Sequence, residues 1–437
     1  MLVVPRPGMA VILLALVGSA TSPTQGSSLP EMQHPSVESF SANASQGRGG
    51  RQRRGALHPH TFLTTPELIQ ARGYPSEVHH VVSPDGYVLE LHRIPCGRRH
   101  LVHGRYCNTG VRRRVVFIQH CLLCSSADFV MNDPDQALGF VMADAGYDVW
   151  LGNTRGNVYS RRHRRLSPKQ PEFWDFSWEE IGRFDMPAML QYVREVTKTP
   201  ILDYIGHSMG TTVFFVMMNY HPHINNWIRA MVAMAPVAYM HNKRAPISIF
   251  APFVNVIDKF LEAKGFNEIS RSTKGFSKLA SAACSPNSLL KFICSLVYFL
   301  IDGPTSDYVD KDYVPVIFAH TPAGTSRRVV THFLQVIAAE KFQAYDHGAK
   351  RNLEMYGMRT PLVYSLAEVR VPVGIFWSES DWVADPRDVY RTALELPNAT
   401  LFQRVPPRDF SHTDFLWAEN ARQFVYDPLM NFFNSNP

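Results

Sequence analysis

The sequence predicts an α/β fold, with a mostly parallel, doubly wound sheet into which a largely helical segment is inserted. Three observations lead to this prediction. Strand and helix patterns alternate at short intervals from about residue 113 to 239, the alternation then breaks for about 125 residues, and strand patterns return at 369–378 and 399–405. Short alternation of this kind implies parallel strands joined by helices, so one core split by an insertion is expected.

The elements before the insertion follow from local patterns. Residues 79–94 predict a β-hairpin, because two alternating runs flank Pro84-Asp85-Gly86. Residues 113–120 form a continuous apolar run with β-branched residues, which is typical of a strand buried on both faces. The alternation then predicts a helix and a strand within 138–153, a helix at 184–198, a strand at 201–207, a helix at 208–220 and a strand at 228–238.

The chain is expected to have five parts. The insertion is irregular and mostly helical, and its clearest helix spans 326–343. The parts are a signal peptide at 1–20, a low-complexity segment at 21–60, the first part of the core at 61–239, the insertion at 240–365 and the second part of the core at 366–437.

The N-terminal residues have the pattern of a secretory signal. Arg6 precedes an apolar run at 9–18 that is too short to span a bilayer, and small residues follow. Residues 21–60 show no helical or strand periodicity, which predicts a disordered segment. Within it, "RQRR" at 51–54 has two interpretations that stay open, a processing site that releases a pro-segment or a solvated basic run. No later apolar run reaches the roughly 18 residues of a membrane span, so no transmembrane segment is expected.

Composition narrows the class of protein. Five Arg and two Glu in residues 1–54 account for half of the net charge of +6, so the rest of the chain gives no case for nucleic-acid binding. Asn43 and Asn398 begin N-x-S/T sequons, which fits glycosylation of a secreted protein.

The six cysteines predict disulfides in an oxidising compartment, although six cysteines allow fifteen pairings. Local spacing favours a bond between Cys284 and Cys294, and it offers Cys96 with Cys107 as a second pair.

The stretch "YIGHSMGTT" at 204–212 carries the first chemical signal. It places Ser208 between Gly206 and Gly210 in the pattern G-x-S-x-G, after an expected strand and before an expected helix. A sharp strand-to-helix turn lifts a serine hydroxyl above the sheet, and the flanking glycines let neighbouring backbones approach. The sequence therefore predicts the nucleophile elbow of an α/β-hydrolase fold, with Ser208 as the nucleophile.

A serine nucleophile needs a base, and the base needs an orienting carboxylate. In this fold the chain order is serine, acid, histidine. Asp381 follows an expected strand, whereas Asp385 and Asp388 lie where the next helix is expected to be capped. His412 is the single histidine beyond Asp381, which makes it the candidate base. Asp414 is interpreted as a surface carboxylate without a role.

The oxyanion of an acyl-transfer intermediate needs N–H donors, one after the nucleophile and one in a loop after an early strand. Met209 supplies the first amide, and "VVFIQHCLL" predicts the Leu122 amide as the second. The Cys121-x-x-Cys124 pattern beside Leu122 is interpreted as incidental. A zinc site would need further ligands besides His120 and these cysteines, and the sequence shows no second motif that would supply them. A thioredoxin-like redox pair would lie at the start of a helix, and no helix is expected there. No metal or cofactor is therefore expected.

Longer motifs extend these observations along the chain. They are "GYPSEVHHVVSPDGYVLELHRIP" (73–95), "QHCLLCSSADFV" (119–130), "ADAGYDVWLGNTRGNVYSRRH" (143–163), "FWDFSWEEIGRFDMPA" (173–188), "AGTS" (323–326), "DWVADPRDV" (381–389) and "HTDF" (412–415). With the elbow, they resemble the acid lipase family of α/β hydrolases, the gastric and lysosomal lipases and their arthropod relatives, over about residues 64–431.

The resemblance implies a triad of the three candidate side chains, the two oxyanion amides, and no cofactor. It also implies that the insertion at 240–365 forms a cap or lid, whose disulfide would join Cys284 and Cys294. Three positions depart from the family pattern. Met209 replaces a glutamine whose backbone alone is used, "SESD" (378–381) replaces G-x-x-D, and Cys121 replaces a glycine. If that last position needs a positive φ, the cysteine costs roughly 1–2 kcal/mol and distorts the loop short of inactivation.

The insertion is rich in Phe, Leu, Ile and Val, as in "FICSLVYFLI" (292–301). An apolar cap over an esterase site favours a water-insoluble ester, and the resemblance implies triacylglycerol or steryl esters cleaved at a lipid–water interface by a secreted or lysosomal lipase. The basic cluster at 155–165 is interpreted as a solvated loop in preference to a contact with anionic lipid. Two alternatives stay open, a non-catalytic lipid-binding or storage protein and an acyltransferase. No protein partner is implied.

Overall fold

The computed structural model of the chain describes residues 58–102, 106–108, 110–242, 244, 246–269, 282–284, 288 and 307–437. The predicted signal peptide (1–20), Asn43, the basic run at 51–54 and Cys294 lie outside these residues.

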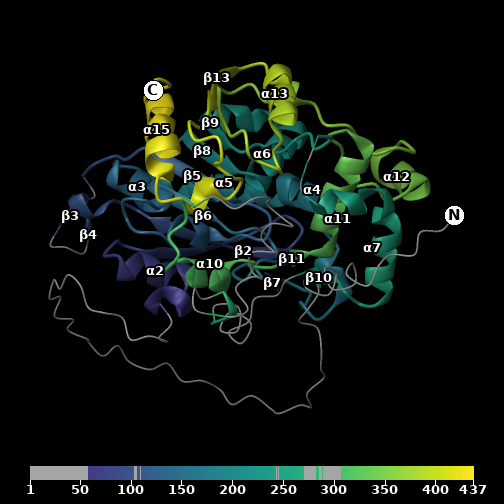
Figure 1. Ribbon diagram of the computed structural model, residues 1–437, viewed down its shortest axis with the longest axis horizontal. Coiled ribbons are helices and arrows are strands. Elements are labelled where there is room, and N and C mark those ends of the chain that lie inside the picture. Colours follow the sequence, from purple (N-terminus) through teal and green to yellow (C-terminus); the bar gives the residue numbers. More distant parts are fainter. Residues whose placement is uncertain are drawn as a thin grey trace, which may run out of the picture.

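A nine-stranded sheet lies at the centre of the described residues (Figure 1). Its order is β1-β2-β6-β5-β8-β9-β12-β13, with β7 beside β2. Every neighbouring pair from β6 to β13 is parallel, and β2 pairs antiparallel with β1, β6 and β7. This order confirms the predicted, mostly parallel α/β fold. The strands are β1 Glu77–Val82, β2 Tyr87–Ile94, β5 Val115–Gln119, β6 Asp148–Gly152, β7 Arg162–His163, β8 Leu202–His207, β9 Ile228–Met234, β12 Val373–Trp377 and β13 Ala399–Arg404.

Helices cover both faces of this sheet. Helix α13 packs against β12 and β13, and Phe432 of α15 packs against Gly374 of β12. Figure 1 shows α13 and α15 on opposite sides of β13. The helices are α2 Thr65–Ala71, α3 Leu138–Asp144, α4 Trp178–Glu180, α5 Met186–Thr197, α6 Met209–Tyr220, α7 Val254–Ala263, α10 Val314–His320, α11 Arg327–Ala339, α12 Ala349–Tyr356, α13 Pro386–Glu395, α14 Asp414–Trp417 and α15 Asp427–Asn434.

The early strands form where the apolar patterns predict them. In β5, Val115 is 3% exposed and the next three residues are fully buried, because β6 and β8 lie on its two sides and helices cover the sheet. The predicted hairpin is β1 and β2, paired from Glu77 with Arg93 to Val82 with Val88.

One arginine of the basic cluster at 155–165 is buried. Arg155 is 1% exposed and donates to Asp185 at 2.9 Å and to Asp85, in the hairpin turn, at 2.6 Å. Its guanidinium also lies 4.0 Å from the centre of the Tyr87 ring. A buried ion pair with two carboxylates therefore ties the loop after β6 to the β1–β2 turn. Arg162 and other members of the cluster are exposed, as predicted.

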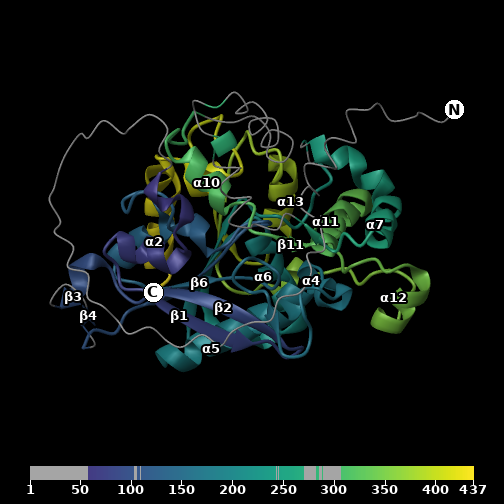
Figure 2. The same cartoon turned by 90° about the horizontal axis from the view of Figure 1, so that it is seen from below.

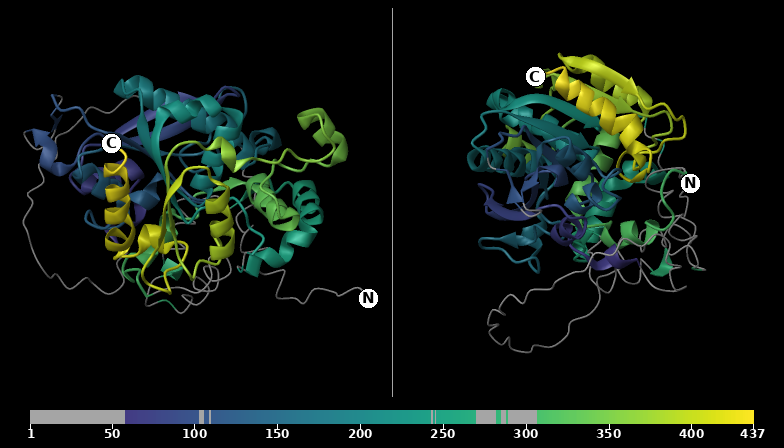
Figure 3. Two further views of the ribbon diagram at one scale, coloured as in Figure 1. Left: turned by 90° about the horizontal axis from the view of Figure 1, so that it is seen from above. Right: turned by 90° about the vertical axis from the view of Figure 1, so that its left-hand side faces the viewer.

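Between β9 and β12 the described residues are mainly helical and add no strand to the central sheet. The two-residue strands β10 Glu268–Ile269 and β11 Thr325–Ser326 pair with each other. Helices α7, α11 and α12 gather at one end of the molecule (Figures 2 and 3). The limits of a separate cap at 240 and 365 stay a prediction. None of the helices in the described part of the chain is long and apolar enough to cross a membrane.

Two disulfides lie in the first part of the chain. Cys96 and Cys107 are bonded, with Cα atoms 5.9 Å apart, which confirms the second pair that spacing offered. Cys121 and Cys124 form the other bond. The predicted pairing of Cys284 with Cys294 stays a prediction, because Cys294 is outside the described residues.

Candidate active site

The turn at Ser208 has the geometry of the predicted elbow. Strand β8 ends at His207, α6 begins at Met209, and Ser208 between them has φ 52° and ψ −116°. A non-glycine residue in this region is strained. Its N–H donates to the Met234 carbonyl at the end of β9, at 3.1 Å. Ser208 therefore sits at the carboxyl end of β8, with 6% of the residue exposed.

Both glycines of the motif are required by close backbone approaches. A Cβ atom on Gly206 would lie 2.7 Å from the carbonyl carbon of Gly210, and a Cβ atom on Gly210 would overlap the Gln119 carbonyl oxygen. The first turn of α6 thus packs directly on the end of β5. Gly210, the residue after Met209, therefore lies against the start of the loop that contains Leu122.

Asp381 and His412 form a buried pair. Nδ1–H of His412 donates to Asp381 Oδ2 at 2.7 Å, and the other carboxylate oxygen accepts the N–H groups of Val383 (2.8 Å) and Ala384 (2.7 Å). Burial alone would raise the pKa of Asp381, but the charge of His412 and these hydrogen bonds outweigh burial and hold the pKa below its ordinary value. The carboxylate is therefore charged at neutral pH and determines which nitrogen of His412 carries the hydrogen.

The backbone of His412 lies against the elbow. Nε2–H of His207, the residue before Ser208, donates to the His412 carbonyl at 2.9 Å, and the two ring centroids are 5.0 Å apart. Burial, and then the charge of His412, lowers the pKa of His207 to about 3, so His207 is neutral. The structure thus brings together the elbow, the loop after β12 and the loop before α14. Sequence reasoning missed His207, and its place directly before the nucleophile was the available signal.

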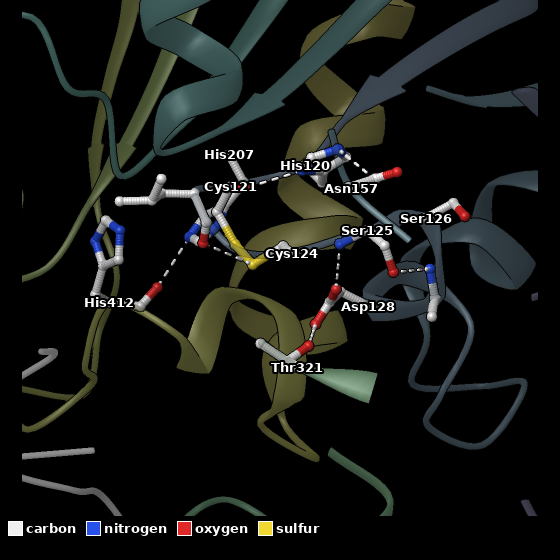
Figure 4. The surroundings of a disulfide bond; sticks show 12 residues. His120, Cys121, Cys124, Ser125, Ser126, Asp128, Asn157, His207, Thr321 and His412 are labelled. Atoms are coloured by element: carbon white, nitrogen blue, oxygen red, sulfur yellow. Dashed lines mark hydrogen bonds between the residues drawn. A yellow bond between two sulfur atoms is a disulfide. The ribbon is translucent and has the colours of Figure 1, made fainter. Parts of the chain in front are cut away.

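The loop after β5 corrects two predictions. Cys121 and Cys124 are joined by a disulfide, with Cα atoms 5.2 Å apart, so the interpretation of this pattern as incidental is wrong (Figure 4). Cys121 is also not the residue with positive φ. That residue is Leu123, with φ 61°. The strain expected at Cys121, roughly 1–2 kcal/mol, therefore falls on Leu123, two residues later.

His120 holds the peptide between Cys121 and Leu122. Its Nδ1–H donates to the Cys121 carbonyl at 2.7 Å, and Nε2 accepts the Thr154 N–H at 3.2 Å and the Asn157 side-chain amide at 3.3 Å. Burial lowers the pKa of His120 to about 4, so the ring is neutral, with hydrogen on Nδ1. Figure 4 shows His120 and Asn157 beside the disulfide. No sequence pattern predicted these hydrogen bonds of His120.

The competing carboxylates have other partners. Asp385 is the N-cap of α13 and accepts from the Arg387 N–H at 3.0 Å, as predicted. Asp388 does not cap that helix, because it accepts from the backbone and side chain of Asn242. Asp414 is not a surface carboxylate. It is fully buried and accepts the Ser411 N–H at 2.5 Å.

The predicted glycosylation site at Asn398 is partly accessible. Asn398 lies half-buried in the turn between α13 and β13, and its Nδ2 donates weakly to the Arg370 carbonyl at 3.3 Å. Its glycosylation stays a prediction. Within the described ranges, no group of three or more His, Cys, Asp or Glu side chains is arranged to hold a metal ion.

Comparisons with known proteins agree with this geometry. Residues 65–133 match the model of a partial α/β-hydrolase lipase region, and residues 114–417 match the α/β hydrolase fold. The chain is 36% identical to lipase lipl-1 of Caenorhabditis elegans over 86% of its own length and 93% of that protein. It is 35% identical to human gastric triacylglycerol lipase, over 87% and 94% of the two chains.

A solved structure shows the same fold. The monoglyceride lipase of Saccharomyces cerevisiae, in complex with a substrate analogue, superposes with a TM-score of 0.51 at 15% identity, covering 87% of this chain and 99% of the yeast chain. Together, the family models and the relatives of this length and identity show that the chain belongs to the lipase family of the α/β-hydrolase fold.

Proposed function

We propose that the chain hydrolyses carboxylic esters of water-insoluble lipids through an acyl-enzyme on Ser208. The proposal rests on one observation above all, the buried Asp381–His412 pair held against the elbow that presents Ser208. In the first step, His412 Nε2 takes the proton of Ser208 Oγ as the oxygen attacks the ester carbonyl carbon. The intermediate collapses, the ester C–O bond breaks, and the proton passes to the leaving alcohol. Water then attacks the acyl group by the same proton transfers and releases the carboxylic acid.

In this proposal the amides of Leu122 and Met209 bind the oxyanion. Met209 is the first residue of α6, so its N–H has no acceptor one turn earlier in the helix and lies at the positive end of the helix dipole. The Leu122 N–H belongs to the same peptide unit as the Cys121 carbonyl that His120 holds. Donors that are fixed before the reaction begins stabilise developing charge without reorganisation.

A lipid substrate is supported by an exposed apolar row in the predicted cap at 240–365. Ile249, Phe253, Val256 and Phe260 recur every three or four residues and are 65%, 61%, 71% and 56% exposed. Val256 and Phe260 lie four residues apart in α7 and therefore share one side of that helix, and Ile249 and Phe253 lie in the 3-10 turn directly before it. Exposed apolar side chains gathered in this way mark interaction sites. We propose that this row contacts the lipid phase and that the substrates are triacylglycerols and steryl esters.

The two disulfides between described cysteines support a secretory protein, extracellular or lysosomal. Such bonds persist in oxidising compartments and are rare in the cytosol.

The test is a chain-length series of esters, assayed from pH 4 to 8 with the wild type and Ser208→Ala. The proposal expects hydrolysis of long-chain esters by the wild type, with a loss on the order of 10⁶-fold in the variant. Full activity in Ser208→Ala would overturn it. An inactive wild type that a serine-directed phosphonate does not label would instead indicate a lipid-binding protein. Predominant ester formation with added alcohol would indicate an acyltransferase.

A further inference from the structure

We propose that the Cys121–Cys124 disulfide is a positioning element of the oxyanion hole, which acts by fixing the peptide that carries the Leu122 N–H. The inference rests on the proposed function, because an oxyanion donor has a role only in acyl transfer. It assigns a catalytic consequence to a bond between two cysteines that are not among the three triad residues.

The first step concerns the peptide between Cys121 and Leu122. Its carbonyl oxygen accepts two hydrogen bonds, from His120 Nδ1 at 2.7 Å and from the Cys124 N–H at 3.3 Å. A peptide unit is planar and trans, so its N–H points in the direction opposite to its C=O. Holding the Cys121 carbonyl from two sides therefore fixes the direction of the Leu122 N–H, and turning that N–H requires both hydrogen bonds to break.

The second step concerns the turn itself. The hydrogen bond from Cys124 to Cys121 closes a four-residue turn, and Leu123 at its third position has φ 61°. Turns with positive φ at this position ordinarily carry glycine or asparagine, because other side chains are strained there. Leu123 therefore favours opening of the turn, which would release the Cys121 carbonyl from the Cys124 N–H. The disulfide joins the first and last residues of the same turn and opposes that change.

The third step concerns what the disulfide is anchored to. Cys121 is 4% exposed and Cys124 is 3% exposed. After Cys124 the chain is held by Asp128, which accepts the Ser125 N–H at 2.8 Å and the Thr321 hydroxyl at 2.8 Å. Figure 4 shows these contacts on the side of the disulfide away from His120. The bond thus connects the peptide of Leu122 to a buried segment that is itself held by hydrogen bonds.

The test compares turnover in matched variants. Cys121→Ala/Cys124→Ala removes the bond, and Cys96→Ala/Cys107→Ala is the control, since it removes the other disulfide. kcat and KM are measured on a soluble p-nitrophenyl butyrate and normalised to the active sites that a phosphonate titrates, so that only folded enzyme counts. We expect kcat to fall about tenfold in the first variant with KM unchanged within twofold, because loss of the whole donor costs about 10²–10³ and His120 still holds the carbonyl. The control pair keeps its kcat.

A rescue distinguishes positioning from a merely structural role. Leu123→Gly relieves the strain that the disulfide opposes, so it should restore at least half of the lost turnover in the variant without the bond and change the wild type less than twofold. Cys124→Ala alone is the second variant, for the case that the double variant does not fold, and it should lose as much kcat. Unchanged kcat in an active wild-type background, an equal loss in the control pair, or no rescue would overturn the inference. A wild type without esterase activity would overturn the proposed function as well.

Discussion

The hydrogen bonds around Asp381 determine how its replacement by asparagine should affect His412. Oδ1 accepts the N–H groups of Val383 and Ala384, so in Asp381→Asn the amide oxygen must take this position. The amide NH₂ group is then directed at His412 Nδ1, which lies 2.7 Å from Oδ2 in the native pair. Two donors cannot share this contact, so the imidazole changes tautomer and carries its hydrogen on Nε2.

A His412 ring with hydrogen on Nε2 cannot accept the Ser208 proton. We therefore expect kcat to fall about 10³–10⁴-fold, the size of effect known for a wrong tautomer in such triads. This corresponds to about 4–5.5 kcal/mol of lost transition-state stabilisation. The assay is kcat on a soluble short-chain ester, with the rate of phosphonate labelling of Ser208 as a second measurement.

Asp385→Asn is the matched control. Asp385 lies in the same loop and caps α13, a role that asparagine fills equally well, so its turnover should stay within about threefold. The reasoning is refuted if Asp381→Asn keeps more than a tenth of the wild-type kcat, or if the control loses as much as the variant.

Three further predictions concern stability, and urea unfolding measures each. Gly210→Ala should lower the free energy of unfolding by about 3 kcal/mol, because the new Cβ overlaps the Gln119 carbonyl; a loss below about 0.5 kcal/mol would contradict this packing. Arg155→Met leaves the buried Asp185 without its cation and should cost about 3–5 kcal/mol, whereas a neutral result would show that the pair is dispensable. His120 has a pKa lowered by burial from 6.5 to about 4, so the folded state binds fewer protons than the unfolded chain between these values. The contribution of neutral His120 to the free energy of unfolding, up to about 3 kcal/mol, is fully present above pH 6.5 and is lost as the pH falls toward 4. The change in the free energy of unfolding over this pH range should therefore be smaller in His120→Gln. An equal change in the variant would contradict the assignment.

Much of the fold could be predicted because its strands are buried on both faces. Val115 and the three residues after it are apolar because strands and helices cover them, and that apolar run is visible in a single sequence. The elbow at Ser208 could be predicted because a serine at a strained strand-to-helix turn needs glycines at fixed positions beside it. His412 followed from chain order alone, since the sequence offers no other histidine after Asp381.

The predictions that failed concern residues whose burial or bonding depends on how the backbone folds. Arg155 is buried because Asp85 and Asp185, far from it in the sequence, converge there. Asp414 is fully buried and accepts the nearby Ser411 N–H, a contact that its charge alone did not indicate. The bond between Cys121 and its partner depends on a turn conformation that residue spacing does not specify. Charge and spacing identify such residues as polar or reactive, but only the tertiary structure supplies their partners.

The central claim is an acyl-enzyme on Ser208, and trapping that intermediate tests it most directly. The enzyme is mixed with a p-nitrophenyl ester, quenched in acid within milliseconds, and digested for mass spectrometry of the peptide that contains Ser208. We predict a burst of nitrophenol close to one equivalent, with the acyl mass on Ser208 and on no peptide of Ser208→Ala. Steady ester hydrolysis by the wild type with no acyl group on Ser208 would contradict the account.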